Sequence, residues 1–296
     1  MSAATYALHG TTIGFDRPVR ILQGIETEAA PVWRVRLCHP RTVTAPRQWT
    51  LRWDDGSLRQ TADDEGPWFR FRGAFDVHLV GRDLVTRVRA GRDLAARALV
   101  DLIVPMLRAD EGALPLHAAA FTGPEGATVL LGPNGAGKST LTAIAAASGR
   151  RILADDCVVL EVDSGRAIAH RGVPSIGMHP EVAAALGFDG PARPDDEDDK
   201  LDVALTSEQR AAEATPVRRI VVLGDRWHTA GFGEEPLSGG AALAELADQV
   251  HAGVDGTPAT ALLEQLATLI DAVPVVHARI PDGFDAARSA LEASGW

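Results

Sequence analysis

The chain has 296 residues, enough to bury a substantial core as one large domain or two moderate ones. Hydrophobic residues make up 46% and charged residues 23% of the sequence, a composition that excludes wholesale disorder. The formal net charge of −11 argues against a nucleic-acid partner, because such a surface repels phosphate backbones unless a local basic patch overrides the average.

The two cysteines and the apolar stretches bear on the compartment. Cys38 and Cys157 are far apart and lack CxxC spacing, so we expect neither a disulfide framework nor a zinc site. Residues 1–10 lack the basic and apolar regions of a signal peptide. No apolar stretch reaches the ~20 residues that a membrane helix needs. We therefore expect a cytoplasmic protein without a membrane partner.

Residues 1–93 are expected to form a strand-rich N-terminal domain. Apolar and polar residues alternate along residues 32–37, 49–53, 68–72 and 75–80, and residues 54–57 have the composition of a turn. Four of the six tryptophans fall in this region. We favour core filling for these aromatic side chains, since strands use them freely; the alternative is a docking surface for a substrate.

Residues 94–296 are expected to form a second domain. Apolar residues at three-to-four spacing predict a linking helix over residues 94–107, which Pro105 should kink or end. After Gly112 strands and helices alternate, as in an α/β fold. The predicted strands are residues 127–132, 152–162, 217–224 and 273–280, and the predicted helices are residues 138–147, 240–252 and 284–294.

Residues 191–200 have an unusual composition. Five acidic residues lie between prolines and Lys200. Charge repulsion and proline favour a solvated, mobile surface loop. A loop beside a phosphate site can instead attract a basic substrate or close over a nucleotide.

The strongest motif is Gly132–Ser139, which matches the P-loop pattern G-x-x-x-x-G-K-[ST] at every fixed position. Its glycines allow backbone N–H groups to surround an anion, and the following helix directs its positive end at the same place. We expect Lys138, facing solvent, to contact the β- and γ-phosphates of ATP, and the Ser139 hydroxyl to ligate Mg²⁺. The predicted nucleotide-binding residues are Gly132, Asn134, Gly135, Ala136, Gly137, Lys138, Ser139 and Thr140.

The letters GPNGAGKST are typical of ABC-transporter ATPases, and residues 237–240 resemble their LSGGQ signature. Three features oppose that assignment. The residues after Gly240 do not continue the signature, no apolar strand ending in Asp-Glu follows, and the acidic pair Asp155–Asp156 lies only 17 residues after Lys138. We interpret the LSGG segment as a helix start, with Ser238 as a possible N-cap.

Residues 116–120, the P-loop and residues 152–156 occur in an order and spacing that resemble the catalytic domain of HPr kinase/phosphorylase. The stand-alone HPr-kinase-like serine kinases are more similar still. The resemblance extends over roughly residues 95–290, since residues 236–243 and 273–275 also look like the C-terminal pattern of the family. It implies an α/β P-loop kinase domain, related in fold to ATP-dependent phosphoenolpyruvate carboxykinases, after a small strand-rich region.

The resemblance also implies roles for the acidic pair. One aspartate accepts the proton of the attacking hydroxyl, and the other helps to hold Mg²⁺. We assign the base to Asp155 and the metal to Asp156 together with Ser139, although the two aspartates are interchangeable at this stage.

Three further residues match positions of the family. His117 matches a histidine near the phosphates that can orient the aspartate or carry positive charge. Arg171 and Lys200 match cations that can contact the transferring phosphoryl group. The alternatives are a hydrogen-bonded core histidine and two surface cations.

The sequence departs from HPr kinase/phosphorylase itself. Thr140 stands where that enzyme usually has Glu, and residues 171–177 echo its glycine-rich signature only faintly. The favoured function is ATP- and Mg²⁺-dependent phosphorylation of a serine in a peptide or protein, for example a lasso-peptide precursor. The alternatives are a small-molecule hydroxyl kinase and a non-catalytic nucleotide-binding regulator; the acidic pair argues against the regulator. A homo-oligomer stays possible.

Overall fold

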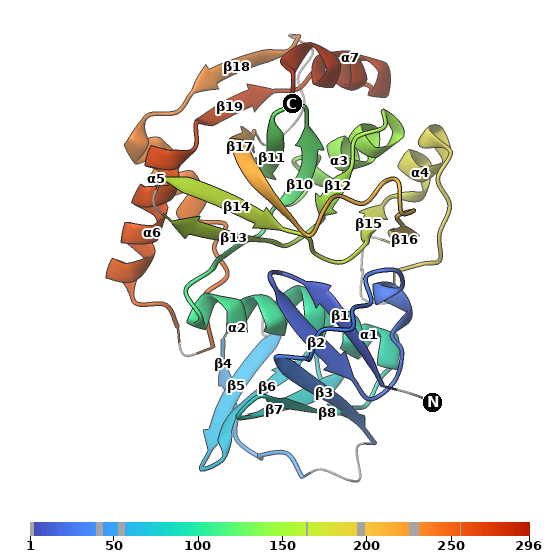
Figure 1. Cartoon of the computed structure of the whole chain (residues 1–296), viewed down its shortest axis with the longest axis vertical. Helices are drawn as coiled ribbons and strands as arrows, with labels where there is room; N and C mark the ends of the chain where they lie inside the picture. Colours follow the sequence, from blue (N-terminus) through green and yellow to red (C-terminus); the bar gives the residue numbers. More distant parts are fainter. Residues whose placement is uncertain are drawn as a thin grey trace. The chain divides into compact units, whose positions relative to one another are not determined.

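The computed structural model describes residues 3–39, 44–52, 57–163, 165–193, 199–224, 231–254 and 256–296 (Figure 1). The chain divides into two compact units, Met1–Ile103 and Val104–Trp296. The sequence placed the boundary after residue 93. The division of the structure lies later because one helical stretch runs from Arg92 to Asp110.

The described part of the first unit is a mixed sheet with the strand order β1-β2-β3-β8-β7-β6-β5-β4. Strands β2, β3 and β8 are parallel to one another, and the other neighbours pair antiparallel. The short turn η1 (Arg20–Leu22) follows β2. The strands are β1 (Ala4–Leu8), β2 (Thr11–Phe15), β3 (Trp33–Cys38), β4 (Thr50–Leu51), β5 (Leu58–Asp63), β6 (Gly66–Phe71), β7 (Phe75–Val80) and β8 (Asp83–Val88).

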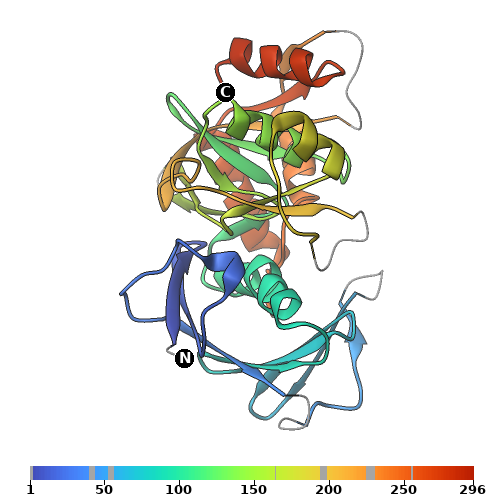
Figure 2. The ribbon, with the colours of Figure 1, turned by 90° about the vertical axis from the view of Figure 1, so that its right-hand side faces the viewer.

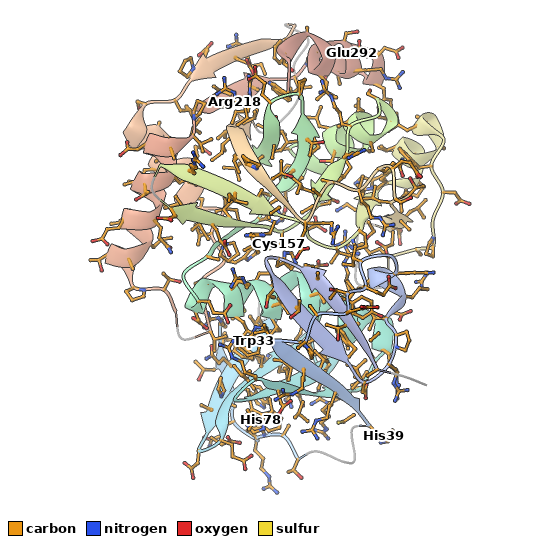
Figure 3. The ribbon with its side chains drawn as sticks, in the orientation of Figure 1. Trp33, His39, His78, Cys157, Arg218 and Glu292 are labelled. Carbon is orange, nitrogen blue, oxygen red and sulfur yellow. The ribbon has the colours of Figure 1, made fainter. Side chains whose placement is uncertain are left out.

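Aromatic side chains fill the core of this unit, as the favoured interpretation predicted. Trp33, labelled in Figure 3, is 5% exposed and Trp68 is 2% exposed. Trp68 stacks on His78 with ring centroids 4.1 Å apart. Trp49 is half-buried, with the Arg70 guanidinium 4.2 Å from its ring centroid. Trp53 and residues 54–56 of the predicted turn lie outside the described residues.

The predicted helix over residues 94–107 is longer than expected. It comprises α1 (Arg92–Ala98), the π-helical turn η2 (Leu99–Ile103) and α2 (Val104–Asp110). Pro105 does not end the helix, which continues for five more residues. Proline has no N–H for the carbonyl of Asp101, and the wider hydrogen-bonding pattern of η2 lies at this point of the helix.

The described part of the second unit is built on a mixed sheet ordered β12-β10-β11-β17-β14-β13-β9, with β19 beside β17 and β18 beside β19. Strands β15 and β16 form a separate antiparallel pair. The strands are β9 (Leu114–Leu116), β10 (Ala119–Gly123), β11 (Gly126–Leu131), β12 (Ile152–Ala154), β13 (Val158–Asp163), β14 (Arg166–His170), β15 (Ser175–Met178), β16 (Leu201–Ala204), β17 (Ala214–Leu223), β18 (Gly233–Pro236) and β19 (Val275–Arg279).

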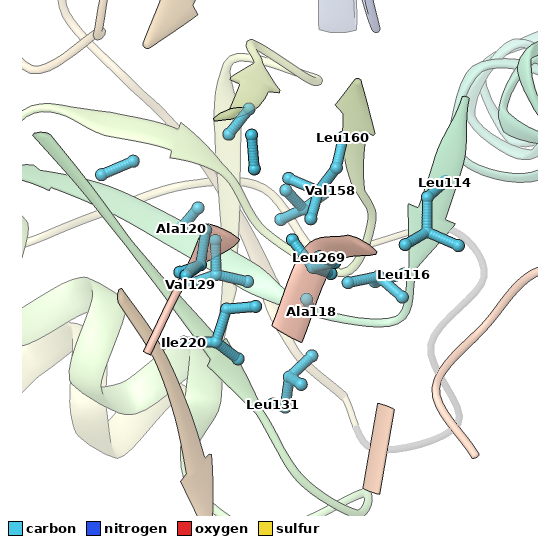
Figure 4. Packing of buried hydrophobic residues seen from close by; sticks show 14 of the residues in the cluster. Leu114, Leu116, Ala118, Ala120, Val129, Leu131, Val158, Leu160, Ile220 and Leu269 are labelled. Carbon is cyan, nitrogen blue, oxygen red and sulfur yellow. The ribbon is translucent and has the colours of Figure 1, made fainter. Parts of the chain in front are cut away.

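Helices cover both faces of this sheet (Figures 1 and 2). On one face Val129 and Ile220 pack against α5 (Gly239–Ala247) and α6 (Ala259–Ala272), in the cluster of Figure 4. On the other face Leu130 and Val221 pack with α3 (Lys138–Ala147), α4 (Pro180–Leu186) and α7 (Phe284–Ser294). Strands buried on both faces are continuously apolar, which is why β11 and β17 were visible in the sequence.

Several predicted elements are confirmed, and one helix is shorter than predicted. Helices α3 and α7 have the predicted bounds. Ser238 caps α5, its hydroxyl accepting the N–H of Ala241 at 3.4 Å. Helix α5 ends at Ala247 instead of residue 252, because the chain then pairs with the β9 segment: the His117 N–H donates to the Gln249 carbonyl at 2.7 Å. No described helix is long and apolar enough to cross a membrane. Cys38 and Cys157 are both free thiols.

Candidate functional site

The three motifs meet at one edge of the second sheet. Strand β10 is antiparallel to both β11 and β12, so β11 and β12 end at the edge where β10 begins. His117 precedes β10, the glycine-rich loop Gly132–Ser139 follows β11, and Asp155–Asp156 follows β12. The loop also adjoins the end of the parallel strand β17. Ligands of open α/β sheets bind at such carboxyl ends.

The conformation of the glycine-rich loop depends on its glycines. Gly132, Gly135 and Gly137 have φ angles of +142°, +83° and +95°. A Cβ on Gly132 would lie 2.8 Å from the Leu223 carbonyl oxygen, whereas one on Gly135 would meet no atom within 4 Å. Gly137 is the N-cap of α3, so the positive end of that helix lies at the loop. The backbone N–H groups of a glycine-rich loop at the start of a helix suit an anion.

Lys138 is buried rather than solvent-facing, which corrects the sequence-based expectation. Its side chain is 7% exposed. Its Nζ donates to the carbonyls of Gly132 at 2.6 Å and Pro133 at 3.2 Å. Burial lowers the pKa of the Lys138 ammonium, against the attraction of Asp156 and Asp155. The carbonyls of the loop stabilise the ammonium in this position.

A cavity of about 170 Å³ opens over the loop. The chain contains only two lysines, and both Lys138 and Lys200 line this cavity. Asp156 lies on its wall. The predicted residues on the wall are His117, Asn134, Gly135, Gly137, Lys138, Ser139, Thr140, Asp156 and Lys200; Pro133, Gly177, Met178, His179 and Val182 were not predicted. Gly132 and Ala136, both buried, support the loop instead.

Asp155 lies behind the cavity wall and is 3% exposed. Its Oδ2 accepts the N–H of Gly177 at 2.9 Å, and its Oδ1 has no hydrogen-bond partner among the described residues. Burial, and after it the charge of Asp156, raise the pKa of Asp155 to about 7. The Gly177 N–H, Arg193 and the Ser139 hydroxyl oppose this shift. The carboxyl therefore titrates near neutral pH in the metal-free protein.

Asp156 has the left-handed φ of +72°, which is uncommon for a residue with a side chain. Its carboxylate, 30% exposed, forms an ion pair with Arg193, whose side chain is 9% exposed. Its carbonyl accepts the Nδ1–H of His117 at 3.1 Å. Sequence reasoning missed Arg193, because it belongs to the acidic segment that was interpreted as a solvated loop.

His117 joins the acidic pair to the glycine-rich loop. Its Nε2 lies 3.0 Å from the Asn134 side-chain amide. Burial and the Lys138 charge lower the pKa of His117, so the ring is neutral at pH 7 and orients its neighbours instead of carrying charge. The atom placed at that distance is Asn134 Oδ1; with Nδ1 protonated, Nε2 of the neutral ring accepts, so the Asn134 amide must be turned to present its NH₂ instead. His251 packs edge-to-face on His117, and burial lowers its pKa to about 4.

Arg171 lies away from the cavity, unlike the expectation for a phosphoryl contact. It is half-buried, and its backbone N–H donates to the Glu213 carbonyl at 2.8 Å. Burial lowers the pKa of its guanidinium, with Glu213 and Arg210 as its charged neighbours. Residues 194–198 of the acidic segment lie outside the described residues. The predicted mobile loop falls on these residues.

The donor set at the loop fits Mg²⁺. This hard cation prefers oxygen ligands and keeps several waters. The Ser139 hydroxyl lies beside Asp155, whose buried Oδ1 is available as a ligand within the described structure. No group of three or more His, Cys, Asp or Glu side chains arranged for a metal is found in the described ranges.

Comparisons with known proteins add little. No protein-family model matches the sequence, and no curated protein matches it. Matches among solved structures include the HPr(Ser) kinase/phosphatase from Coxiella burnetii, at 10% identity and a TM-score of 0.33. That match covers 61% of this chain and 95% of the other. A likeness of this size carries no argument about fold or function.

Proposed function

We propose that this protein is an ATP- and Mg²⁺-dependent kinase that transfers the γ-phosphoryl group to a serine hydroxyl of a peptide or protein. The observation that carries the proposal is the convergence of the only two lysines on the cavity over the glycine-rich loop. Twenty-seven of the 29 basic residues are Arg (29 − 2), and both lysines of the chain line this cavity. A compact ammonium suits the point charge of a phosphate oxygen.

The residues of the chain divide the work of phosphoryl transfer. The loop N–H groups and the positive end of α3 bind the phosphates. The Lys138 ammonium exchanges its hydrogen bonds to the carbonyls of Gly132 and Pro133 for contacts with the phosphates. Lys200, which directly precedes β16, also lines the cavity, where it can balance charge on the transferring group. Most of the catalysis in this reaction class is such positioning and charge neutralisation.

The geometry favours exchanged roles for the two aspartates. Asp155, buried beside Ser139, is the better metal ligand, and Asp156, on the cavity wall, is the one that an acceptor hydroxyl can reach. The bound Mg²⁺ would neutralise phosphate charge as the γ-phosphoryl departs. Asp156 would take the hydroxyl proton as the new O–P bond forms, and ADP would leave with the electrons of the broken bond.

A basic serine peptide is the acceptor that the charges favour. The chain carries 40 acidic against 29 basic residues, and five acidic residues precede Lys200, a residue of the cavity wall, in the sequence. An acceptor with Lys or Arg near its serine would be attracted to this surface. A lasso-peptide precursor is the specific candidate that we would test first; the role is inferred by resemblance.

Two experiments test the proposal. The first measures nucleotide binding without turnover: an amine-reactive reagent is applied with and without ATP and Mg²⁺, and modification of Lys138 and Lys200 is quantified by mass spectrometry. We expect protection of Lys200, because the phosphates would cover it; Lys138, buried and bonded to two carbonyls, should react slowly even without ATP. The second incubates serine peptides with basic or acidic flanks, free serine and sugars with ATP and Mg²⁺, and measures phosphate gain.

The outcomes separate the candidate functions. Phosphoserine on the basic peptides supports the proposal. Transfer to free serine or a sugar alone would replace the peptide kinase by a small-molecule kinase. Protection of Lys200 without transfer to any acceptor would favour a nucleotide-binding regulator, and absence of protection would contradict the nucleotide site.

A further inference from the structure

Asp156 is held in an unfavourable backbone conformation. A φ of +72° is sparsely populated by residues with a side chain and persists only where the surroundings stabilise it. Two contacts do so in this structure. His117 donates to the Asp156 carbonyl at 3.1 Å, and Arg193 pairs with its carboxylate. The backbone and the side chain of Asp156 are thus each restrained by a separate residue.

Arg193 is itself fixed by the backbone next to it. Its N–H donates to the Lys200 carbonyl at 2.7 Å, and Ala192 forms a β-bridge with Leu201 at the start of β16. Strand β16 pairs in register with β15, whose Gly177 faces Asp202. The Arg193 side chain is 9% exposed and therefore has little room to move away from Asp156.

Gly177 leaves the space that this arginine occupies. A Cβ at position 177 would overlap Arg193 Nη1, whereas it would lie 3.7 Å from Asp155 Oδ2, an ordinary contact. The same residue donates its N–H to Asp155. A side chain at this position would therefore displace the guanidinium first and leave the carboxyl of Asp155 in place.

We propose that Arg193 is a positioning residue that holds the Asp156 carboxylate toward the cavity, and that Gly177 is required because its missing side chain gives the guanidinium its place. The proposal rests on the proposed kinase function for its kinetic consequences, but not for its structural ones. Arg193 need not touch the substrate; it acts through Asp156.

The kinetic test compares Arg193→Gln, Arg193→Lys and a matched control, Arg218→Gln. Arg218, labelled in Figure 3, lies in the same unit. It forms an exposed ion pair with Glu125 at 2.8 Å, with side chains 56% and 69% exposed. We expect Arg193→Gln to lower kcat by about 10- to 100-fold with KM for ATP within about 3-fold, because a misplaced reacting group affects the chemical step. Arg193→Lys should recover part of the loss, and the control should resemble wild type.

Gly177→Ala provides a second, independent variant that retains the arginine. We expect it to lower kcat like Arg193→Gln, and the double variant should be no slower than Arg193→Gln alone, since both changes break one contact. Fully multiplicative effects in the double variant, or wild-type turnover of a folded Arg193→Gln protein, would overturn the proposal. Thermal melting shows which variants are folded.

Hydrogen exchange of nucleotide-free protein tests the positioning without turnover. We expect faster exchange of the amides at residues 154–158 in both Arg193→Gln and Gly177→Ala, and no change in Arg218→Gln. Unchanged exchange in both variants would refute the positioning role. If wild type transfers phosphate to no acceptor but exchange responds as expected, the kinase proposal fails while the positioning of Asp156 stands.

Discussion

Lys138 offers the most direct test of the site. We consider Lys138→Met, which removes the ammonium group but keeps most of the aliphatic stem, beside Lys138→Ala. If the ammonium stabilises developing charge on the β- and γ-phosphates, its removal should lower phosphoryl transfer by about 100- to 1000-fold, as for other preorganised charge-stabilising groups. In free energy this is roughly 3–4 kcal/mol of the barrier.

The stability of the same variants follows from contacts in the structure. The two hydrogen bonds from Nζ to Gly132 and Pro133 are lost, each contributing about 1 kcal/mol net. The burial cost that lowers the pKa of the ammonium is removed at the same time. Since these effects oppose each other, we expect the free energy of unfolding to change by no more than ~1 kcal/mol, or about 2–4 °C in melting temperature.

The assay combines three measurements on each variant. Thermal melting reports the fold, an ATP titration reports binding, and phosphate gain on the best acceptor reports transfer. A folded Lys138→Met protein that transfers phosphate at the wild-type rate would refute the assigned role of Lys138. A melting temperature lowered by far more than 4 °C would show that the loop needs its lysine for folding, contrary to the balance of effects above.

Three further predictions follow from the site. Asp155→Asn and Asp156→Asn should each lower turnover at least ~10-fold, which is about 1.4 kcal/mol of barrier. Only the variant of the metal ligand, which we expect to be Asp155, should also need more Mg²⁺ for activity, and a Mg²⁺ titration of both variants decides this. Because the pKa of Asp155 is raised to about 7, the folded state without metal binds more protons than the unfolded state above pH 4, so its stability should fall as pH rises from about 4 to about 7. Chemical denaturation at several pH values should show that the free energy of unfolding of Asp155→Asn depends less on pH than that of wild type. Equal pH dependence in the two proteins would contradict the raised pKa. Gly132→Ala should destabilise the protein by about 2–3 kcal/mol, because its Cβ would clash with the Leu223 carbonyl and its φ is positive, and Gly135→Ala by about 1 kcal/mol through its positive φ alone. Equal losses of unfolding free energy in denaturant titrations would contradict the effect of the clash.

The sequence alone determined the local parts of this site. The pattern Gly132–Ser139 predicted a loop between a buried strand and a helix, and the structure has β11 and α3 there. This works because glycine at left-handed φ and a 3.6-residue apolar period are local properties. Helix α7 also has the bounds that the sequence predicted.

Elements whose character depends on distant partners were not predicted. The short strands β9, β15 and β16 were missed, since three or four residues carry no clear period. The predicted strand at residues 152–162 is divided into β12 and β13 by the turn that holds Asp155–Asp156. Only the sheet partners decide where such an apolar run breaks.

The tertiary structure decided what each charged residue of the site does. The sequence selected Lys200 and Arg171 equally, yet in the folded chain Lys200 lines the cavity and Arg171 lies beside Glu213. The buried position of Lys138 and the pair of Asp156 with Arg193, 37 residues apart, arise from the packing of loops over one sheet edge. Burial and long-range pairing are properties of the folded chain, because desolvation and charge separation depend on atoms that the local sequence does not contain.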